Sequence, residues 1–261
     1  MTRHILDNLI HIMKRLRSEN GCPWDKEQTH DSIKRYILEE AYELIEAIDE
    51  NDTHKMKDEL GDILFQVIFH CQLASENKSF TIEDVIKNAE EKMIRRHPHV
   101  FSDKKLSTPD EVIDQWDKIK QTEHAHRHRT SVLDGVPTNM PSLMRADKVQ
   151  KKAAKTGFDW DKPEHIIDKI QEELYETTES LKEGDRKKIA EEIGDLFFAV
   201  ANLARFLKFD PEELSRKSVD KFIKRFKQVE QELASRGKHP QDSTLAEMDD
   251  IWNANKTTKK K

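Results

Sequence analysis

The feature that most constrains this chain is a set of four carboxylates that occurs twice with the same spacing. The first set (the first square) is Glu40, Glu43, Glu59 and Asp62, and the second set (the second square) is Glu173, Glu176, Glu192 and Asp195. Residues three apart lie on one face of a helix, so both members of each ExxE or ExxD pair project together if these segments are helical. Each square then needs two helices that bring their acidic faces to one place.

The spacing also predicts how these helices meet. In each square the inner and the outer pairs share one midpoint, which is Asn51 in the first square and Gly184 in the second. Both residues lie in short turn-like runs. If two helices fold back at such a turn, Glu43 would lie opposite Glu59 and Glu40 opposite Asp62. The second square would pair in the same way.

Four carboxylates at helix-contact distance repel one another and are costly to remove from water, so the arrangement implies a compensating cation. Oxygen ligands suit a hard ion, and Mg²⁺ is expected, with Mn²⁺ as an alternative. In a chain with 37% charged residues, one ExxE pair would more simply be a solvated helix face. Two squares with the same internal spacing, each beside an apolar run, favour metal centres.

The composition indicates an all-α protein, because the chain has only 7 Gly and 8 Pro and is rich in helix-forming residues. An amphipathic helix opens it and stops near Asn20-Gly21. The run at residues 63–69 is apolar almost all round and is predicted to be buried. Further end signals are Thr29 as the cap of the helix that carries Glu40, Thr81 with Asp84 as a helix start, Pro98 as a stop and Pro109 as another start.

Charge and hydropathy exclude several classes of protein. The net charge of −6 gives no overall attraction to nucleic acid, and direct nucleic-acid binding is not expected. No apolar run approaches the roughly 20 residues of a membrane span. The N-terminus has no signal-peptide core, so a soluble cytoplasmic protein without a membrane partner is expected.

Features besides the squares also recur in the same order, which indicates an internal duplication. Trp24-Asp25-Lys26 returns as Trp160-Asp161-Lys162, and Trp116 returns as Trp252 at the same offset of 136 residues. We expect an N-terminal helical domain at 1–127, a linker at 128–141 and a C-terminal helical domain at 142–261. Alternate histidines do not share a helix face, so His124, His126 and His128 are assigned to the connecting stretch and not to a metal site.

Basic and aromatic residues accompany each square. Lys221 and Arg225 are four apart, share a helix face and could clamp phosphate oxygens. Trp252 could stack on a purine or pyrimidine ring. Taken singly, such residues are more often a solvated face or part of a core, but their recurrence in both halves favours a nucleotide phosphate site.

These residues resemble the MazG family of nucleoside triphosphate pyrophosphohydrolases. The resemblance rests on Glu-Glu-x-x-Glu followed by Glu-x-x-Asp, and it extends to Gly21-Cys22-Pro23-Trp24-Asp25, to Arg95-Arg96-His97-Pro98-His99-Val100-Phe101 and to Gly157-Phe158-Asp159-Trp160. It covers essentially the whole chain in the two-domain form. It implies a duplicated helical-bundle, all-α NTP pyrophosphatase fold that assembles as a homodimer. It also implies Mg²⁺-dependent hydrolysis of NTPs or dNTPs to the monophosphate and pyrophosphate, in nucleotide housecleaning or stress physiology.

The resemblance further implies a role for each matching residue. The second square would hold the metal, Glu172 would orient or deprotonate the attacking water, and Trp252 would face the base. The triphosphate would be faced by Lys169, Lys188, Lys221 and Arg225. In the first half the basic group would be Lys92, Arg95 or Arg96 beside the first square. The C-terminal half would carry the principal activity, leaving the first half as a second site, a weaker site, or a dimerisation and regulatory module.

Two other classes of protein are weighed against this interpretation. Ferritin-like di-metal carboxylate proteins also build a site from inward carboxylates in a four-helix bundle, but they use Glu-x-x-His. No His stands three residues after a glutamate of either square. The non-enzymatic alternative is a module that binds or senses a nucleotide without turnover, above all in the N-terminal half.

Overall fold

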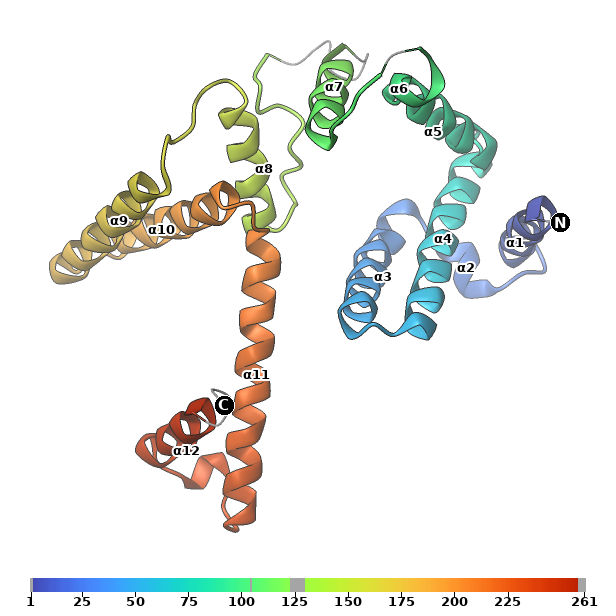
Figure 1. The fold of residues 1–261 in the computed structure, drawn as a ribbon. Helices are drawn as coiled ribbons and strands as arrows, with labels where there is room; N and C mark the ends of the chain where they lie inside the picture. Colours follow the sequence, from blue (N-terminus) through green and yellow to red (C-terminus); the bar gives the residue numbers. More distant parts are fainter. Residues whose placement is uncertain (1, 104, 123–129, 258–261) are drawn as a thin grey trace. The chain divides into compact units, whose positions relative to one another are not determined.

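A computed structural model of the chain describes residues 2–103, 105–122 and 130–257. Every regular element in these ranges is a helix, which confirms the all-α class (Figure 1). None of the helices described is long and apolar enough to cross a membrane. The chain divides into two compact units, Met1–Arg127 and His128–Lys261. The prediction for His124, His126 and His128 lies outside the described residues.

The first unit begins with an N-terminal helix, and its other helices are largely set by their end residues. Thr29 and Ser32 form a capping box at the start of α3, and Thr81 and Asp84 form another at the start of α5, as predicted. The helices α5 and α7 end and begin beside the predicted prolines. The elements are α1 (Thr2–Leu16), α2 (Pro23–Glu27), α3 (His30–Glu50), α4 (Thr53–Glu76), α5 (Ile82–Arg96), α6 (Pro98–Phe101) and α7 (Pro109–Thr122).

The core of the first unit lies where α1 packs against the α3–α4 hairpin. Its buried side chains are Met13, Ile33, Ile68, Phe69 and Leu73, and Tyr36 and Phe65 pack against them. Burying each such side chain stabilises the fold by roughly 1.5–3 kcal/mol relative to leaving it exposed. The predicted amphipathic helix is therefore present as α1, and its apolar side chains pack in this core.

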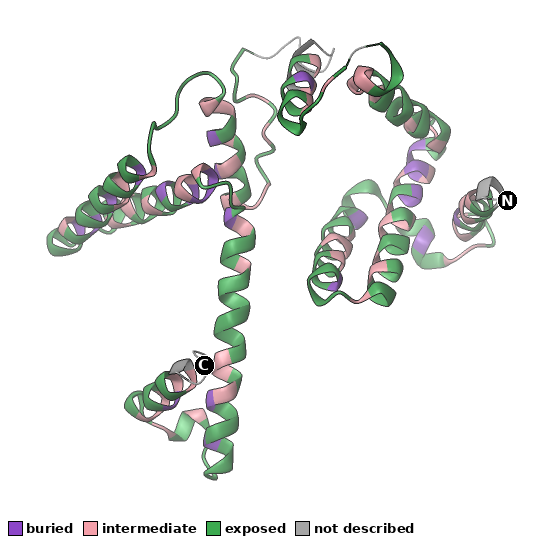
Figure 2. Ribbon diagram, viewed as in Figure 1, coloured by how far each residue is buried: buried purple, intermediate pink, exposed green. Residues whose placement is uncertain are grey.

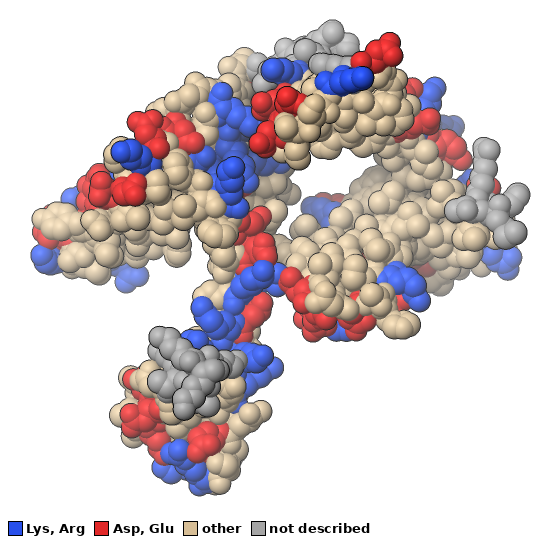
Figure 3. Space-filling model, viewed as in Figure 1, with Lys and Arg blue, Asp and Glu red and all other residues tan. Residues whose placement is uncertain are grey.

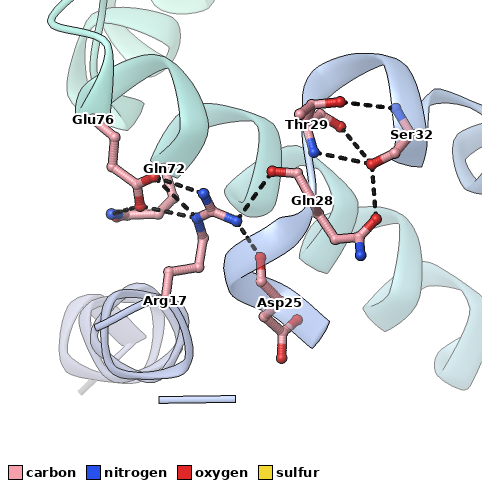
Figure 4. A network of polar contacts seen from close by, with 7 residues as sticks. All are labelled: Arg17, Asp25, Gln28, Thr29, Ser32, Gln72 and Glu76. Atoms are coloured by element: carbon pink, nitrogen blue, oxygen red, sulfur yellow. Dashed lines mark hydrogen bonds and ion pairs between the residues drawn. The ribbon is translucent and has the colours of Figure 1, made fainter. Parts of the chain in front are cut away.

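A buried arginine fastens the end of α1 to α4 (Figure 4). The side chain of Arg17 is 8% exposed, and its Nε and Nη2 atoms donate to the two carboxylate oxygens of Glu76 at 2.7–3.1 Å. Its Nη1 atom donates to the carbonyl oxygens of Asp25 and Gln28. The guanidinium also lies 5.5 Å from the centre of the Phe69 ring. One side chain thus joins the α1–α2 connection to α4.

The second unit is built on the hairpin of α9 and α10. The helix α8 packs on α10, and Gln150 on α8 donates from Nε2 to the carbonyl oxygen of Phe198 at 2.9 Å. The helix α11 packs on α8 and α10, and α12 packs on α11 around Val229, Leu233 and Ile251. The elements are α8 (Ser142–Ala154), α9 (Pro163–Glu183), α10 (Arg186–Phe206), α11 (Pro211–Ser235), the short 3-10 helix η2 (Pro240–Asp242) and α12 (Leu245–Thr257).

The prediction that residues 63–69 are buried is wrong for part of the run. Ile68 and Phe69 are buried, but Leu64 is 41% exposed and Val67 is 40% exposed. The reason is that α3 and α1 cover only part of α4. Figure 2 shows that α11 is likewise exposed along most of its length. Both units therefore present apolar side chains that nothing within the described part of the chain covers.

We predict that Glu76→Gln destabilises the protein in a pH-dependent way. The hydrogen bonds from Arg17 lower the pKa of Glu76 below its ordinary value of 4.5. A lowered pKa stabilises the fold above that ordinary value, and the stabilisation is lost as the pH falls through the folded pKa. Urea denaturation at pH 7 should show a loss of about 1 kcal/mol for this partly exposed pair. Near pH 3 the difference from the natural protein should shrink.

The exposed Glu19→Gln change is the control for this measurement and should have little effect at either pH. A difference for Glu76→Gln that stays the same size in acid would contradict the assigned pairing.

Candidate metal centres

The two hairpins turn at the predicted midpoints. Asn51 adopts the left-handed conformation with φ 55°, and Gly184 does so with φ 74°. The next residue in each case caps the second helix: Asp52 accepts from two backbone N–H groups of α4, and Asp185 accepts from two of α10. Equivalent turns therefore set the register of both hairpins.

The first square lies in the middle of the α3–α4 hairpin. Carboxylate oxygens of Glu40, Glu59 and Asp62 lie within 4.8 Å of one another. Partial burial raises the pKa of Glu40, and Asp62 adds the strongest repulsion. Partial burial also raises the pKa of Glu59, with the strongest repulsion from Glu43. These pairings follow the predicted register of Glu40 with Asp62 and Glu43 with Glu59.

The second square occupies the same place on α9 and α10. Oxygens of Glu173, Glu192 and Asp195 lie within 4.8 Å of one another, and Glu173 is only 4% exposed. Loss of solvation raises the pKa of Glu192, followed by repulsion from Glu176 and Glu173. All four carboxylates of the second square are thus close enough to interact.

Two features of the structure fit a hard divalent cation at each square. The ligand atoms are all carboxylate oxygens that converge from two helices, the donor set that Mg²⁺ and Mn²⁺ prefer. Loss of solvation, followed by repulsion between the carboxylates, also raises the pKa of Glu40 and Glu192. A bound cation would replace that repulsion by attraction.

One of the residues predicted to bind the triphosphate, Lys169, lies at the second square. Lys169 Nζ lies 2.7 Å from a carboxylate oxygen of Glu172 and 2.6 Å from one of Glu173. Its hydrogen bonds to these two carboxylates raise the pKa of Lys169 well above its ordinary value. Lys169 therefore stays charged and partly compensates the buried carboxylate of Glu173. Glu172 is exposed and forms a second acidic group with Glu173 and Glu176.

The other residues predicted to bind the nucleotide lie elsewhere in the second unit. Lys188 forms an ion pair with Glu183 at 3.0 Å, near the turn of the hairpin. On α11 and α12, the guanidinium of Arg225 lies 5.9 Å from the centre of the Trp252 ring, which packs on Phe222. Lys221 lies one turn before Arg225 on α11. In Figure 1, α12 packs beside the part of α11 that points away from the α9–α10 hairpin.

A pocket beside the second square was not anticipated from the sequence. Its volume is about 780 Å³, and its walls include Glu173 and Asp195 of the second square. Its other lining residues include Gln150, Phe158, Trp160, Asn202 and Arg205. They come from α8, α10 and the loop between α8 and α9. Comparing the two halves position by position could have signalled this pocket, because polar Asn202 and Arg205 interrupt the apolar stripe of α10.

Comparison with known proteins places this arrangement in a family. The MazG nucleotide pyrophosphohydrolase domain matches the sequence twice, at residues 28–101 and 161–230. Each match contains one complete square. The chain belongs to the MazG family.

Individual relatives are similar in sequence to this protein over nearly the whole of its chain. A Thermotoga maritima protein named nucleoside triphosphate pyrophosphohydrolase/pyrophosphatase MazG is 44% identical over 95% of this chain and 94% of its own length. The Escherichia coli K12 nucleoside triphosphate pyrophosphohydrolase is 43% identical over 95% of both chains. The uncharacterized protein YabN of Bacillus subtilis is 45% identical over 99% of this chain, which matches 53% of that protein. Of these three relatives, the first two match this chain over most of their own length.

We predict that each square binds one divalent cation independently of the other. Manganese titration followed by electron paramagnetic resonance should show two sites per chain. Glu59→Gln should remove one site and Glu192→Gln the other, because each change removes a carboxylate ligand.

The matched controls are Asp58→Asn and Glu191→Gln, which change the exposed neighbouring carboxylates on the same helices. Loss of both sites from a single change, or equal losses in the controls, would contradict two separate centres.

Proposed function

We propose that this MazG protein is a Mg²⁺-dependent nucleoside triphosphate pyrophosphohydrolase that cleaves NTPs or dNTPs between the α- and β-phosphates. The products would be the monophosphate and pyrophosphate. The observation that carries the proposal is the second square, a convergent set of carboxylates with a charged lysine and a pocket beside it. The names of the relatives from Thermotoga maritima and Escherichia coli support the same class of substrate.

The carboxylates of the second square would hold the metal on the α9–α10 hairpin. When bound there, a divalent cation neutralises phosphate oxygens and makes a water molecule more acidic. Glu172 is an exposed carboxylate next to this square, and we assign it to orienting or deprotonating the attacking water. Its ion pair with Lys169 holds its position on the helix surface. The chain therefore supplies both the metal ligands and a candidate base from one helix pair.

Lys169 is assigned to the triphosphate. Its charge is maintained by Glu172 and Glu173, and its position next to the second square lets it also contact phosphate oxygens. Lys188 lies nearer the turn, and it would break its ion pair with Glu183 in order to reach the substrate. Lys221 and Arg225 are assigned to the outer phosphates and Trp252 to the base, on α11 and α12.

We also propose that the protein works as a homodimer. The exposed apolar side chains of the second unit include Leu174 and Tyr175 on α9, Phe197 and Val200 on α10, and Phe222 on α11, each between 48% and 64% exposed. Apolar surfaces of this extent indicate an interface. In the proposed dimer, α11 and α12 of one copy bring Lys221, Arg225 and Trp252 toward the second square of the other copy. We place the dimer in the cytoplasm, where its nucleotide substrates are.

The first half is a second candidate for nucleotide binding, without turnover. Its square has all four carboxylates, but the core that contains Phe69, with Tyr36 packed against it, lies beside the square. This arrangement favours a metal-binding module that dimerises, senses or regulates. It is the alternative function that we retain for the N-terminal half.

The cleaved bond is tested by product analysis. The purified chain, incubated with a panel of nucleoside triphosphates and Mg²⁺, should release monophosphate and pyrophosphate. Addition of a chelator should stop the reaction. Diphosphate with phosphate as products would mean that another bond is cleaved, and binding without turnover would support a sensor.

The division of labour is tested by removing one ligand from each square. Glu176→Ala should lower kcat/KM by more than about 100-fold, because it removes a ligand from the proposed catalytic centre. Glu43→Ala should leave most of the activity. Glu179→Ala and Glu46→Ala, one turn further along the same helices, are matched controls. Equal losses from Glu43→Ala and Glu176→Ala would contradict the assignment of activity to the second half.

The dimer is tested by Phe197→Glu, which places a charge on a 63% exposed apolar residue of α10. Light scattering should show a dimer for the natural protein and a monomer for the variant, and turnover should fall with dissociation. Lys187→Glu, at an exposed position near the start of α10, should leave both unchanged. A monomeric variant with full activity would mean that one chain contains the whole site.

A further inference from the structure

Two histidines meet at the open end of the first hairpin, the end away from the turn at Asn51. Nδ1 of His30, the first residue of α3, lies 2.7 Å from Nδ1 of His70 on α4. The two rings are nearly parallel, with an angle of 13° between their planes and 5.1 Å between their centres. The histidine pair (His30 and His70) therefore joins the start of α3 directly to α4.

The hydrogen bond between the rings limits how many protons the histidine pair can hold. A bond between two Nδ1 atoms needs one N–H group and one free lone pair. If both rings were protonated, two N–H groups would face each other at 2.7 Å, and the contact would have to open. The doubly charged pair is thus incompatible with the closed end of the hairpin.

The other ring nitrogen of His70 favours the neutral pair. His70 Nε2 is buried and has no hydrogen bond. A buried N–H group without an acceptor costs roughly 1–3 kcal/mol, so His70 is most stable with its proton on Nδ1, donating to His30. One added proton places an N–H group on Nε2 of His70, whichever of the two rings is charged. Even the first proton therefore weakens the contact.

The surroundings of the histidine pair add to this effect. Loss of solvation, followed by the charge of His30, lowers the pKa of His70 below its ordinary value of 6.5. His30 lies in the first turn of α3, where the helix dipole disfavours a positive charge. Because His70 is harder to protonate in the folded chain than in the unfolded chain, stability is lost as the pH falls from 6.5 toward the folded pKa.

Among the residues that the structure describes, the charged group that acts on His70 is His30. In Figure 3, Asp and Glu side chains gather over the turn end of the α3–α4 hairpin, which is the end opposite the histidine pair. The charged groups on the adjoining elements are Arg17 of α1 paired with Glu76 of α4, Asp31 paired with Lys34 on α3, Lys14 of α1 and Glu83 of α5 beside Cys71, and Asp25, Lys26 and Glu27 on α2.

The histidine pair is a feature of the first half. With the two squares superposed in sequence, Pro163 stands at the position of His30 and Leu203 at the position of His70. Neither of these side chains can share a proton. The α9–α10 hairpin has an equivalent turn and cap but lacks this contact, so it serves as an internal comparison.

We propose that the histidine pair is a pH-sensitive latch of the first hairpin. It holds the start of α3 against α4 when both rings are neutral, and it releases that end when the pair takes up protons in acid. The first square lies between the latch and the turn, so release would loosen the hairpin that carries it. The second hairpin would not respond, because it has Pro163 and Leu203 instead.

Hydrogen–deuterium exchange of the full chain at about pH 7.5 and about pH 5.5 tests the latch. His30→Asn keeps a hydrogen-bonding group near the place of Nδ1 but cannot gain a charge, and His70→Leu installs the residue of the second half. Between the two pH values, the protection factors of backbone amides at the start of α3 should fall by about 5-fold or more in the natural protein. In either variant they should fall by less than about twofold.

His54→Asn, at an exposed position of α4, is the matched control and should keep the full acid response. Amides at the start of α9, measured in the same sample, should not respond. His30→Asn decides the question if His70→Leu does not fold. The proposal would be overturned by an acid response that persists in the folded variants, by an equal response at the start of α9, or by a natural protein whose α3 does not respond.

Discussion

Each half of this protein has to hold carboxylates on two facing helices against their mutual repulsion. Each hairpin holds four acidic side chains, and loss of solvation followed by repulsion from the neighbouring carboxylates raises the pKa values of Glu40, Glu59 and Glu192. The left-handed residue at each turn and the aspartate that follows it fix the helices in register. The packing of α1 on one hairpin and α8 on the other supplies the stability that the acidic faces reduce.

The duplicated hairpins place the same acidic motif in two different surroundings. Both halves keep a complete square, so the acidic motif alone does not separate them. The difference lies in the neighbouring volume, which Phe69 fills in the first half and which remains open beside Asn202 in the second. A packed core favours stability, whereas an open pocket favours ligand binding. Phe69 on α4 and Asn202 on α10 stand at equivalent positions of the two hairpins and differ in size and polarity.

The exposed apolar faces connect the fold to assembly. Helices that lie against neighbours on one side only leave residues such as Leu64 and Phe197 in water. The basic and aromatic residues of α11 and α12 form their own group, and this group belongs to a different helix pair from the second square. Association of two chains would cover the exposed apolar faces. It would also bring the basic and aromatic residues of α11 and α12 to the second square of the other chain, so the proposed site depends on the proposed dimer.

Sequence patterns were sufficient to predict the helical class, the caps at Thr29 and Thr81 and the register of both hairpins, because periodicity, capping and turns act between residues close along the chain. They also identified the carboxylates that converge. Three other features depend on how the helices pack: Leu64 stays exposed, Lys188 turns to Glu183 and a pocket opens between α8 and α10. Those outcomes depend on which surfaces distant helices cover and on the volumes of side chains that meet across the core. No spacing within one helix encodes them.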